Sequence, residues 1–300
     1  MSMNSVTLVT PSFSRDFDRF CLQRESIERC GIDLPHLAIV QTEDLELFRT
    51  CPHQRNLRIV PTLEVLGPTI ERRRRAFGVR RLNHLHWTVR HPVAGWMSQQ
   101  IVKLAAADWV ETPGIAALDS DTFFIDRVTS DDFLTKGKLH LYETAENIDV
   151  QMAEWLCRSM KFLGIDPSGQ PLRQYIHHPF LMHRNVLREM HQFIQQRSGR
   201  PWMEAVLDGN VFECTTYGAF AAHLHKGNLL QPAPPRWTLS YWWPKQVERF
   251  AEDFLTRIRG GNFKIVLIQS NAGRTVAEFR SLIEQAWAAQ PSRSAAVSVA

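Results

Sequence analysis

The amino-acid sequence predicts an α/β fold in which helices flank a mostly parallel sheet. Short β-branched runs alternate with amphipathic stretches of helical length along the first 110 residues. This alternation is typical of parallel strands joined by helices. The 300 residues are 44% hydrophobic, and no proline-, glycine- or serine-rich linker divides the chain. A chain of this length can bury a large core, so we expect a single globular unit.

The elements are expected in a regular order. The first strand covers residues 5–13, where β-branched residues alternate before the turn signal of Pro11 and Ser12. The next elements are a helix over 15–31, a strand over 36–44, a short helix over 44–51, a strand over 56–62, a helix over 93–110 and a strand that begins at 114. Apolar periodicity and terminal glycines support these helices.

The second half of the chain continues with less regular spacing. The expected elements are a strand over 138–144, a helix over 149–164, a strand and helix within 174–199, a helix after Pro201, a helix within 208–224, an irregular loop over 232–246, a strand over 263–271 and a helix over 275–290. In the helix over 149–164, Met152 and Trp155 recur with leucines at helical spacing, which predicts that they belong to the core.

Cysteine content and apolar run lengths indicate the setting of the protein. The five cysteines, an odd number without a C-x-x-C pair, predict free thiols in a reducing compartment. The sequence begins without the pattern of a secretory signal, and no run reaches the roughly 18 apolar residues that span a bilayer. We therefore expect a cytoplasmic protein.

Arginines gather in one stretch between residues 70 and 92. They are Arg72, Arg73, Arg74, Arg75, Arg80, Arg81 and Arg90. Such a run is typical of a solvated helix face, a nucleic-acid patch, or a surface that attracts phosphates or anionic lipid. Because no aromatic-interleaved motif accompanies it, we expect no nucleic-acid partner. Peripheral contact with the inner membrane surface is the further hypothesis.

Two carboxylates follow a buried strand in the segment LDSD, residues 118–121. An extended backbone puts the side chains of Asp119 and Asp121 on the same side. Like charges this close repel, and burial without a partner is unfavourable. Mg²⁺ is usually held by one or two carboxylates together with substrate phosphates. The pair therefore predicts a divalent ion that arrives with a diphosphate, and a turn with Asp121 as a helix cap is the alternative.

Several motifs together resemble GT-A type glycosyltransferases, whose fold is Rossmann-like. They are VTPS at residues 9–12, GW…QQ…K at 95–103, DSD at 119–121 and VFECTTYGAF at 211–220. In particular, the chain is similar to a poorly characterised bacterial group linked to surface-polysaccharide synthesis. The resemblance covers most of residues 5–270 and is strongest over 92–127.

The resemblance implies a function and a division of the chain. It implies transfer of a hexose from a nucleotide-diphosphate sugar to a glycan or lipid-linked acceptor. It also implies a GT-A-like catalytic domain over residues 1–290, with a nucleotide-binding half at 1–127 and an acceptor-binding half at 128–290. Residues 291–300 are expected to be a disordered tail.

Roles for single residues also follow from the resemblance. Asp121 would ligate Mn²⁺ or Mg²⁺, and Asp119 would contact the ribose or the ion. The other residues expected at the donor are Thr10, Pro11, Ser12, Arg90 and Lys103. Because the leaving diphosphate gathers negative charge, arginine and metal at this place would stabilise it.

Candidates for catalysis come from the acceptor half. Glu213, ahead of Tyr217 and Gly218, is the first candidate for the base that accepts the proton of the acceptor hydroxyl, and Asp208 is the second. Thr215 stands where the group has another acidic residue, which keeps a non-catalytic nucleotide-sugar-binding relative open as an alternative.

At the end of the last expected strand, other GT-A enzymes often have a histidine that binds the metal. This chain has Gln269, Ser270 and Asn271 there instead. Two consecutive histidines, His177 and His178, are expected to have a structural role and not to be metal ligands. The third protein ligand of the metal is therefore unassigned.

A second enzyme class shares the D-x-D pattern. In aspartate-nucleophile phosphohydrolases, Asp119 would be the nucleophile and Asp121 the acid and base. Phe123 stands where that class has threonine or valine, and three strands precede the motif instead of none. A sugar nucleotidylyltransferase should carry a glycine-rich N-terminal loop, which is missing from residues 9–17.

Overall fold

The computed structural model describes residues 6–79, 95–146, 148–242, 246, 250–270 and 273–289. Its strands are β1 (Val6–Ser12), β2 (His36–Val40), β3 (Leu57–Pro61), β4 (Gly114–Ala117), β5 (Thr122–Phe124), β6 (Leu134–Thr135), β7 (Lys138–Tyr142), β8 (Phe180–His183), β9 (Leu230–Ala233), β10 (Thr238–Tyr241) and β11 (Ile265–Ile268). Its helices are α1 (Phe17–Arg29), α2 (Leu45–Arg49), α3 (Thr62–Val79), α4 (Gly95–Ala105), α5 (Val150–Leu163), α6 (Arg184–Ser198), α7 (Trp202–Gly209), α8 (Glu213–His223), α10 (Phe250–Gly260) and α11 (Val276–Ala289).

A five-stranded sheet in the order β3-β2-β1-β4-β8 forms the centre of the molecule. Strands β1 to β4 run parallel to one another, and β8 pairs antiparallel with β4 at one edge. The α/β class with a mostly parallel sheet flanked by helices is therefore confirmed. The chain moves from β1 to β2 and β3 on one side and returns with β4 on the other. A crevice forms at such a change of direction, outside the carboxyl ends of the two diverging strands.

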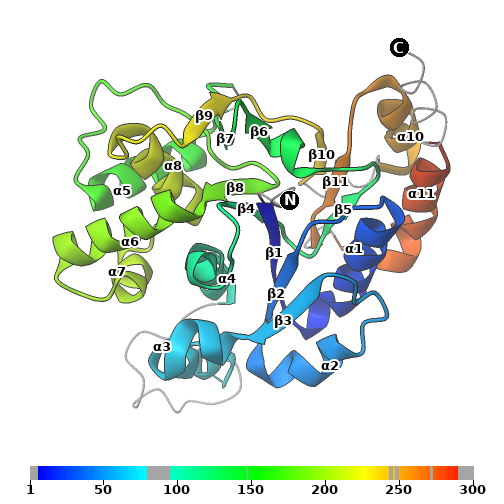
Figure 1. Cartoon of the computed structure of the whole chain (residues 1–300), viewed down its shortest axis with the longest axis horizontal. Coiled ribbons are helices and arrows are strands. Elements are labelled where there is room, and N and C mark those ends of the chain that lie inside the picture. The colour runs from blue at the N-terminus through cyan, green and yellow to red at the C-terminus, as the bar shows by residue number, and fades with distance from the viewer. Residues whose placement is uncertain are drawn as a thin grey trace.

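Side chains of the central strands alternate between two apolar clusters, as the period of two of a strand requires. Val9, Leu37 and Ile115 face a core shared with α4 and with α5 to α8. Leu8 and Ala116 face the opposite side, where Ile27 of α1 packs. Figure 1 shows α4 and the group α5 to α8 on one side of β1, with α1 and α11 on the other.

Two small sheets extend the molecule beyond the central one, in the orders β10-β11-β5 and β6-β7-β9. The loop expected over 232–246 is partly wrong, because Thr238–Tyr241 forms β10 and pairs with Ile265–Ile268. The helix α10 was not expected either. Strand β10 lies within this segment, which is rich in proline and tryptophan, and α10 follows it. The pairing partner of β10 is β11, more than 20 residues further along the chain.

The two aspartates lie where the chain changes sheets. Strand β4 ends at Ala117 in the central sheet, and β5 begins at Thr122 in a different sheet. The strand that begins at 114 therefore stops at the aspartates as expected. Among the described helices, none combines the length and apolar character needed to cross a membrane. The expected tail, 291–300, lies outside the described residues.

Candidate active site

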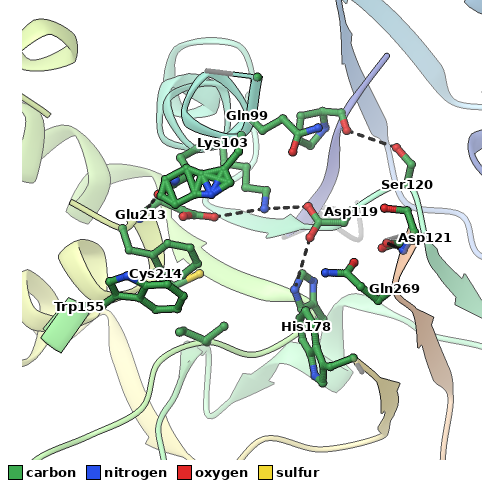
Figure 2. A pocket seen from close by; sticks show the side chains of 18 of the residues that line it. Gln99, Lys103, Asp119, Ser120, Asp121, Trp155, His178, Glu213, Cys214 and Gln269 are labelled. Carbon is green, nitrogen blue, oxygen red and sulfur yellow. Dashed lines mark hydrogen bonds and ion pairs between the residues drawn. The ribbon is translucent and has the colours of Figure 1, made fainter. Parts of the chain in front are cut away.

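A cavity of about 540 Å³ lies at the change of direction between β1 and β4. Pro11 lines it from the end of β1, and Ser120 and Gln269 line it from segments that follow β4 and β11. Helices line the other side, through Gln99 of α4 and Trp155 of α5. Figure 2 shows Ser120, Asp121 and Gln269 on one side of the cavity and Trp155, Glu213 and Cys214 on the other, with Asp119 and Lys103 between them.

Helix α1 and strand β1 hold the turn of residues 119–121 in place. The Gln23 side-chain amide donates to the carbonyl oxygens of Asp119 at 2.8 Å and of Thr122 at 3.0 Å. Ser120 Oγ donates to Ser12 Oγ at 2.8 Å. The backbone that carries both carboxylates is thus fixed by buried hydrogen bonds, which limits its freedom.

Thr10 supports the turn from behind and does not line the cavity. Its hydroxyl, fully buried, donates to Gln23 Oε1 at 3.0 Å and lies 2.9 Å from His36 Nε2. Of the three residues expected to border the nucleotide, Pro11 lines the cavity and Ser12 holds Ser120. A strand alternates its faces, so the VTPS motif divides its side chains between the cavity and the interior.

Lys103 joins the two halves of the site electrostatically. Its Nζ lies 2.8 Å from Asp119 Oδ1 and 3.2 Å from Glu213 Oε1, and its side chain is 8% exposed. Burial disfavours the ammonium, but Asp119 and Glu213 outweigh burial and raise the pKa of Lys103. Burial alone would also raise the pKa of Asp119, yet Lys103 and then His178 lower it below the ordinary value. Asp119 is therefore held as an anion.

His178 faces the same carboxylate as a neutral ring. Burial lowers the pKa of His178 to about 4, against the smaller opposing effect of Asp119. Its Nε2 lies 3.6 Å from Asp119 Oδ2, too far for a good hydrogen bond. The neighbouring His177 does not line the cavity, since its Nε2 faces the Gln174 carbonyl at 3.2 Å. Only one of the two histidines is thus part of the site.

Asp121 differs from Asp119 in having no cation in direct contact among the described residues. Its Oδ2 accepts a hydrogen bond from the Ser270 backbone N–H at 2.8 Å, and its buried Oδ1 has no hydrogen-bond partner in the described structure. Burial, followed by repulsion from Asp119, raises the pKa of Asp121 to about 7. Arg19 of α1 opposes this shift from a distance, and Asp16 adds to it. The Asp121 anion is therefore disfavoured at neutral pH by the surroundings that the structure describes, and a bound cation would stabilise it.

These residues fit a divalent ion that brings its own phosphate ligands. Over the described ranges, no group of three His, Cys, Asp or Glu side chains could hold a metal by itself. Mg²⁺ bound with a diphosphate needs only one or two protein carboxylates. The buried Oδ1 of Asp121, which has no hydrogen-bond partner among the described residues, is such a donor. Asp119 Oδ2 is the second available oxygen, because Lys103 contacts Oδ1.

Glu213 begins helix α8 on the opposite side of the cavity. Its backbone N–H donates to Gln100 Oε1 at 3.0 Å, while its Oε2 is buried without a partner in the described part of the chain. Burial raises the pKa of Glu213, and Lys103 opposes the shift. A carboxylate with a raised pKa and a free oxygen in a cavity is suited to accept a proton.

Other candidate residues lie away from the cavity. Asp208 sits in a surface ion-pair group, 3.1 Å from Arg73 and 2.6 Å from Arg200, and does not line the cavity. Thr215 is buried, and its hydroxyl lies 2.7 Å from Ser159 Oγ between α8 and α5. An acidic residue at 215 would therefore face this helix interface rather than a substrate. Arg90 and Asn271 lie outside the described residues.

Two residues assigned to the core by their spacing line the cavity instead. Met152 and Trp155 belong to the first turns of α5 and face the cavity, whereas Leu156 and Met160 are buried in the core as expected. The helical period predicts which side chains share one face of the helix. It does not predict whether each turn of that face meets the core or the cavity. Residues that line or support the site without having been expected include Phe13, Asp16, Arg19, Gln23, Gln41 and Trp242. Gln41, directly after β2, could have been found from its place at a strand end.

Comparisons with known proteins give a family and some similar structures. The model of a family of unknown function, DUF6492, matches residues 3–285. No curated protein matches the chain. Solved structures similar to it include the galactosyltransferase LgtC with donor and acceptor sugar analogs, at 12% identity and a TM-score of 0.47 over 93% of this chain and 95% of that one. An active-site mutant of LgtC is similar at 13% identity, with a TM-score of 0.48 over 93% of this chain and 95% of that one. Mouse xyloside xylosyltransferase 1 is similar at 12% identity, with a TM-score of 0.46 over 90% of this chain and 99% of that one.

Proposed function

The chain belongs to the family of unknown function DUF6492, and we propose that it is a GT-A type, metal-dependent glycosyltransferase. It would move a hexose from a nucleotide-diphosphate sugar to a glycan or lipid-linked acceptor in surface-polysaccharide synthesis. One observation carries the proposal. A carboxylate oxygen of Asp121 and one of Glu213, both buried and unpartnered in the described structure, belong to opposite sides of one cavity at the carboxyl ends of β1 and β4.

The donor is proposed to bind with its nucleoside beside Pro11, Phe13 and Gln41, which line the cavity at the carboxyl ends of β1 and β2. Its diphosphate would lie toward Asp121, at the carboxyl end of β4. A divalent ion held there by Asp121 and Asp119 would neutralise charge on the leaving diphosphate. Lys103 keeps Asp119 ionised, so the negative charge that attracts the ion persists at neutral pH.

Transfer itself would place the acceptor hydroxyl between the donor and Glu213. The hydroxyl oxygen forms a bond to the anomeric carbon as the bond from that carbon to the diphosphate breaks, through an oxocarbenium-like transition state. The hydroxyl proton passes to Glu213 Oε2, which is free to accept it. Lys103 holds the other oxygen of Glu213 and so orients the carboxylate.

A panel of nucleotide sugars, with and without Mn²⁺, tests the proposal by release of free nucleoside diphosphate. We expect metal-dependent release that is reduced at least a hundredfold in Asp121→Asn. Asp108→Asn is the matched control, because Asp108 pairs with Arg188 at the surface and should tolerate the change. Absence of nucleotide binding in the unmodified protein contradicts the proposal. Phosphate release from phosphoesters through Asp119 would favour the phosphohydrolase, and donor binding without any release would favour a non-catalytic relative.

The proposed setting is the cytoplasm, with peripheral contact at the inner face of the membrane. Its basis is the reducing environment that five free cysteines suggest, together with the arginine-rich stretch. Within that stretch, Arg73, Arg74 and Arg75 form ion pairs with Asp208, Glu71 and Glu43. Membrane attraction would therefore depend on Arg72, Arg80, Arg81 and Arg90.

A further inference from the structure

Three aromatic side chains meet in the cavity: Trp96 of α4, Trp155 of α5 and Phe212, which directly precedes α8; we call them the aromatic cluster. The rings of Trp155 and Phe212 are stacked, with centroids 4.8 Å apart and planes 9° apart. The Trp96 ring approaches Phe212 edge-on at 6.1 Å. All three line the cavity, although Trp96 and Trp155 are 59 residues apart in the sequence and Trp155 and Phe212 are 57 apart. Tertiary packing has thus assembled one continuous apolar wall.

The wall is not explained as part of the core. Phe212 packs against the main apolar cluster, but Trp96 and Trp155 do not belong to that cluster. Trp96 is 46% exposed, the largest exposed fraction of an aromatic side chain in the described structure. Exposed indole surface that borders a cavity marks a binding surface more often than a structural one.

Amide side chains stand beside both tryptophans. Gln99 follows Trp96 by three residues on α4, and Gln151 precedes Trp155 by four on α5. Residues three or four apart share a helix face, and both glutamines line the cavity with the tryptophans. A pyranose ring has the matching chemistry, since its C–H groups form an apolar face and its hydroxyls lie around the edge.

The cluster adjoins the proposed base and not the donor phosphate. Phe212 directly precedes Glu213, and Figure 2 shows Trp155 beside Glu213 and Cys214, across the cavity from Asp121. A ring stacked here would present a hydroxyl to Glu213. A nucleobase of the donor would instead lie near Pro11 and Gln41, at the carboxyl ends of β1 and β2.

We propose that the aromatic cluster is the acceptor subsite and that it binds a pyranose ring, with Gln99 and Gln151 contacting its hydroxyls. The inference rests on the proposed function, because it names the acceptor of that reaction as a hexopyranose at the end of a glycan. A lipid carrier, where one is present, would extend out of the cavity and is not required for binding here.

Saturation-transfer NMR with a panel of methyl hexopyranosides tests the subsite without any turnover. We expect Trp155→Ala and Trp96→Ala each to weaken pyranoside binding by about tenfold, as loss of a stacked ring predicts. Trp155→Phe keeps a ring and should stay within about threefold. Trp109→Ala is the control, because Trp109 packs outside the cavity near Arg58 and should bind the sugar normally. Thermal melts establish that each variant is folded.

Affinity for a nucleoside diphosphate, measured on the same variants, separates the two proposals. Weaker pyranoside binding with unchanged nucleotide affinity supports the subsite. If the protein binds pyranosides through Trp155 but no nucleotide, the subsite stands and the transferase fails. Unchanged pyranoside binding in both alanine variants overturns the subsite, and so does a loss of nucleotide affinity in place of sugar affinity. No pyranoside binding by a protein that binds nucleotide sugars overturns it as well.

Discussion

Asp119 and Asp121 lie two residues apart and meet different electrostatic surroundings. Lys103 contacts Asp119 directly, whereas in the described part of the chain Asp121 is stabilised by the Ser270 backbone N–H and the more distant Arg19. The same burial therefore leaves Asp119 ionised and raises the pKa of Asp121. Lys103 is the residue on which this difference depends.

Replacement of Lys103 by methionine should destabilise the protein strongly. The change leaves the buried carboxylates of Asp119 and Glu213 without their cation, which typically costs about 3–5 kcal/mol. Urea unfolding measures the loss. Arg188→Met is the control, since it breaks the exposed pair with Asp108 and should cost less than about 1 kcal/mol. Equal losses in the two variants would contradict the central role of Lys103.

His191 gives a pH-dependent prediction away from the site. Its ring stacks on Trp202 with centroids 3.7 Å apart, and burial lowers its pKa to about 3. Because the unfolded chain binds this proton near pH 6.5, the free energy of unfolding should fall as pH decreases from about 6.5 toward 3. His191→Gln should reduce the slope below pH 6.5 by up to about 1.4 kcal/mol per pH unit. Denaturant unfolding from pH 4 to 8 measures both slopes, which should coincide above about pH 7.5. A slope unchanged at low pH would show that the ring is not buried as a neutral group.

Tyr217 and Gly218, the consecutive YG pair in helix α8, fix the position of this helix. Tyr217 is fully buried, and its hydroxyl accepts a hydrogen bond from the His183 backbone N–H at 2.8 Å. Gly218 lets α8 approach the buried ring of Tyr175. The pair therefore holds α8 against β8 and the segment before it, and this contact places Glu213 at the cavity.

A methyl group at Gly218 should disturb this contact. An added Cβ would lie 2.1 Å from Tyr175 Cγ, so Gly218→Ala is expected to destabilise the protein by about 1–3 kcal/mol. Gly260→Ala at the end of α10 is the control, because nothing lies within 4 Å of its added Cβ. Thermal unfolding compares the two. A Gly218→Ala protein as stable as the control variant would show that α8 can shift without cost.

At the scale of the whole molecule, the arginine-rich stretch begins on α3, far from α10 in Figure 1. The described arginines 73 to 75 are engaged in ion pairs, which reduces the net positive charge that this surface can offer to a membrane. The remaining positive charge of the stretch belongs to Arg72 and to arginines outside the described residues.

Binding to anionic liposomes tests the membrane proposal. We expect co-sedimentation with phosphatidylserine vesicles at low salt and its loss at about 0.5 M salt, since screening shortens the reach of the charges. The double variant Arg80→Gln/Arg81→Gln should weaken binding by about tenfold or more. Arg257→Gln/Arg259→Gln on α10 removes the same charge elsewhere and should bind normally. Absence of binding at low salt removes the proposal.

The sequence by itself determined the order of the elements around the central sheet. Alternating strands and amphipathic helices predicted β1 to β4 and α1, α2 and α4, because both periods are local properties of the chain. The end of a strand at the LDSD segment was predictable for the same reason. Strand β10 and helix α10 were not, since the segment over 232–246 has no clear period and β10 depends on its pairing with β11.

Only the tertiary structure decided which of these residues form the site. Lys103 and Glu213 are 110 residues apart, and no local pattern states that they share a cavity with Asp119. The same applies to Asp208, which faces the surface, and to Trp155, which leaves the core stripe for the cavity wall. A period fixes which side chains share a face of a helix or strand. What that face meets depends on packing between distant segments, and this packing places Glu213 and Trp155 across the cavity from Asp121.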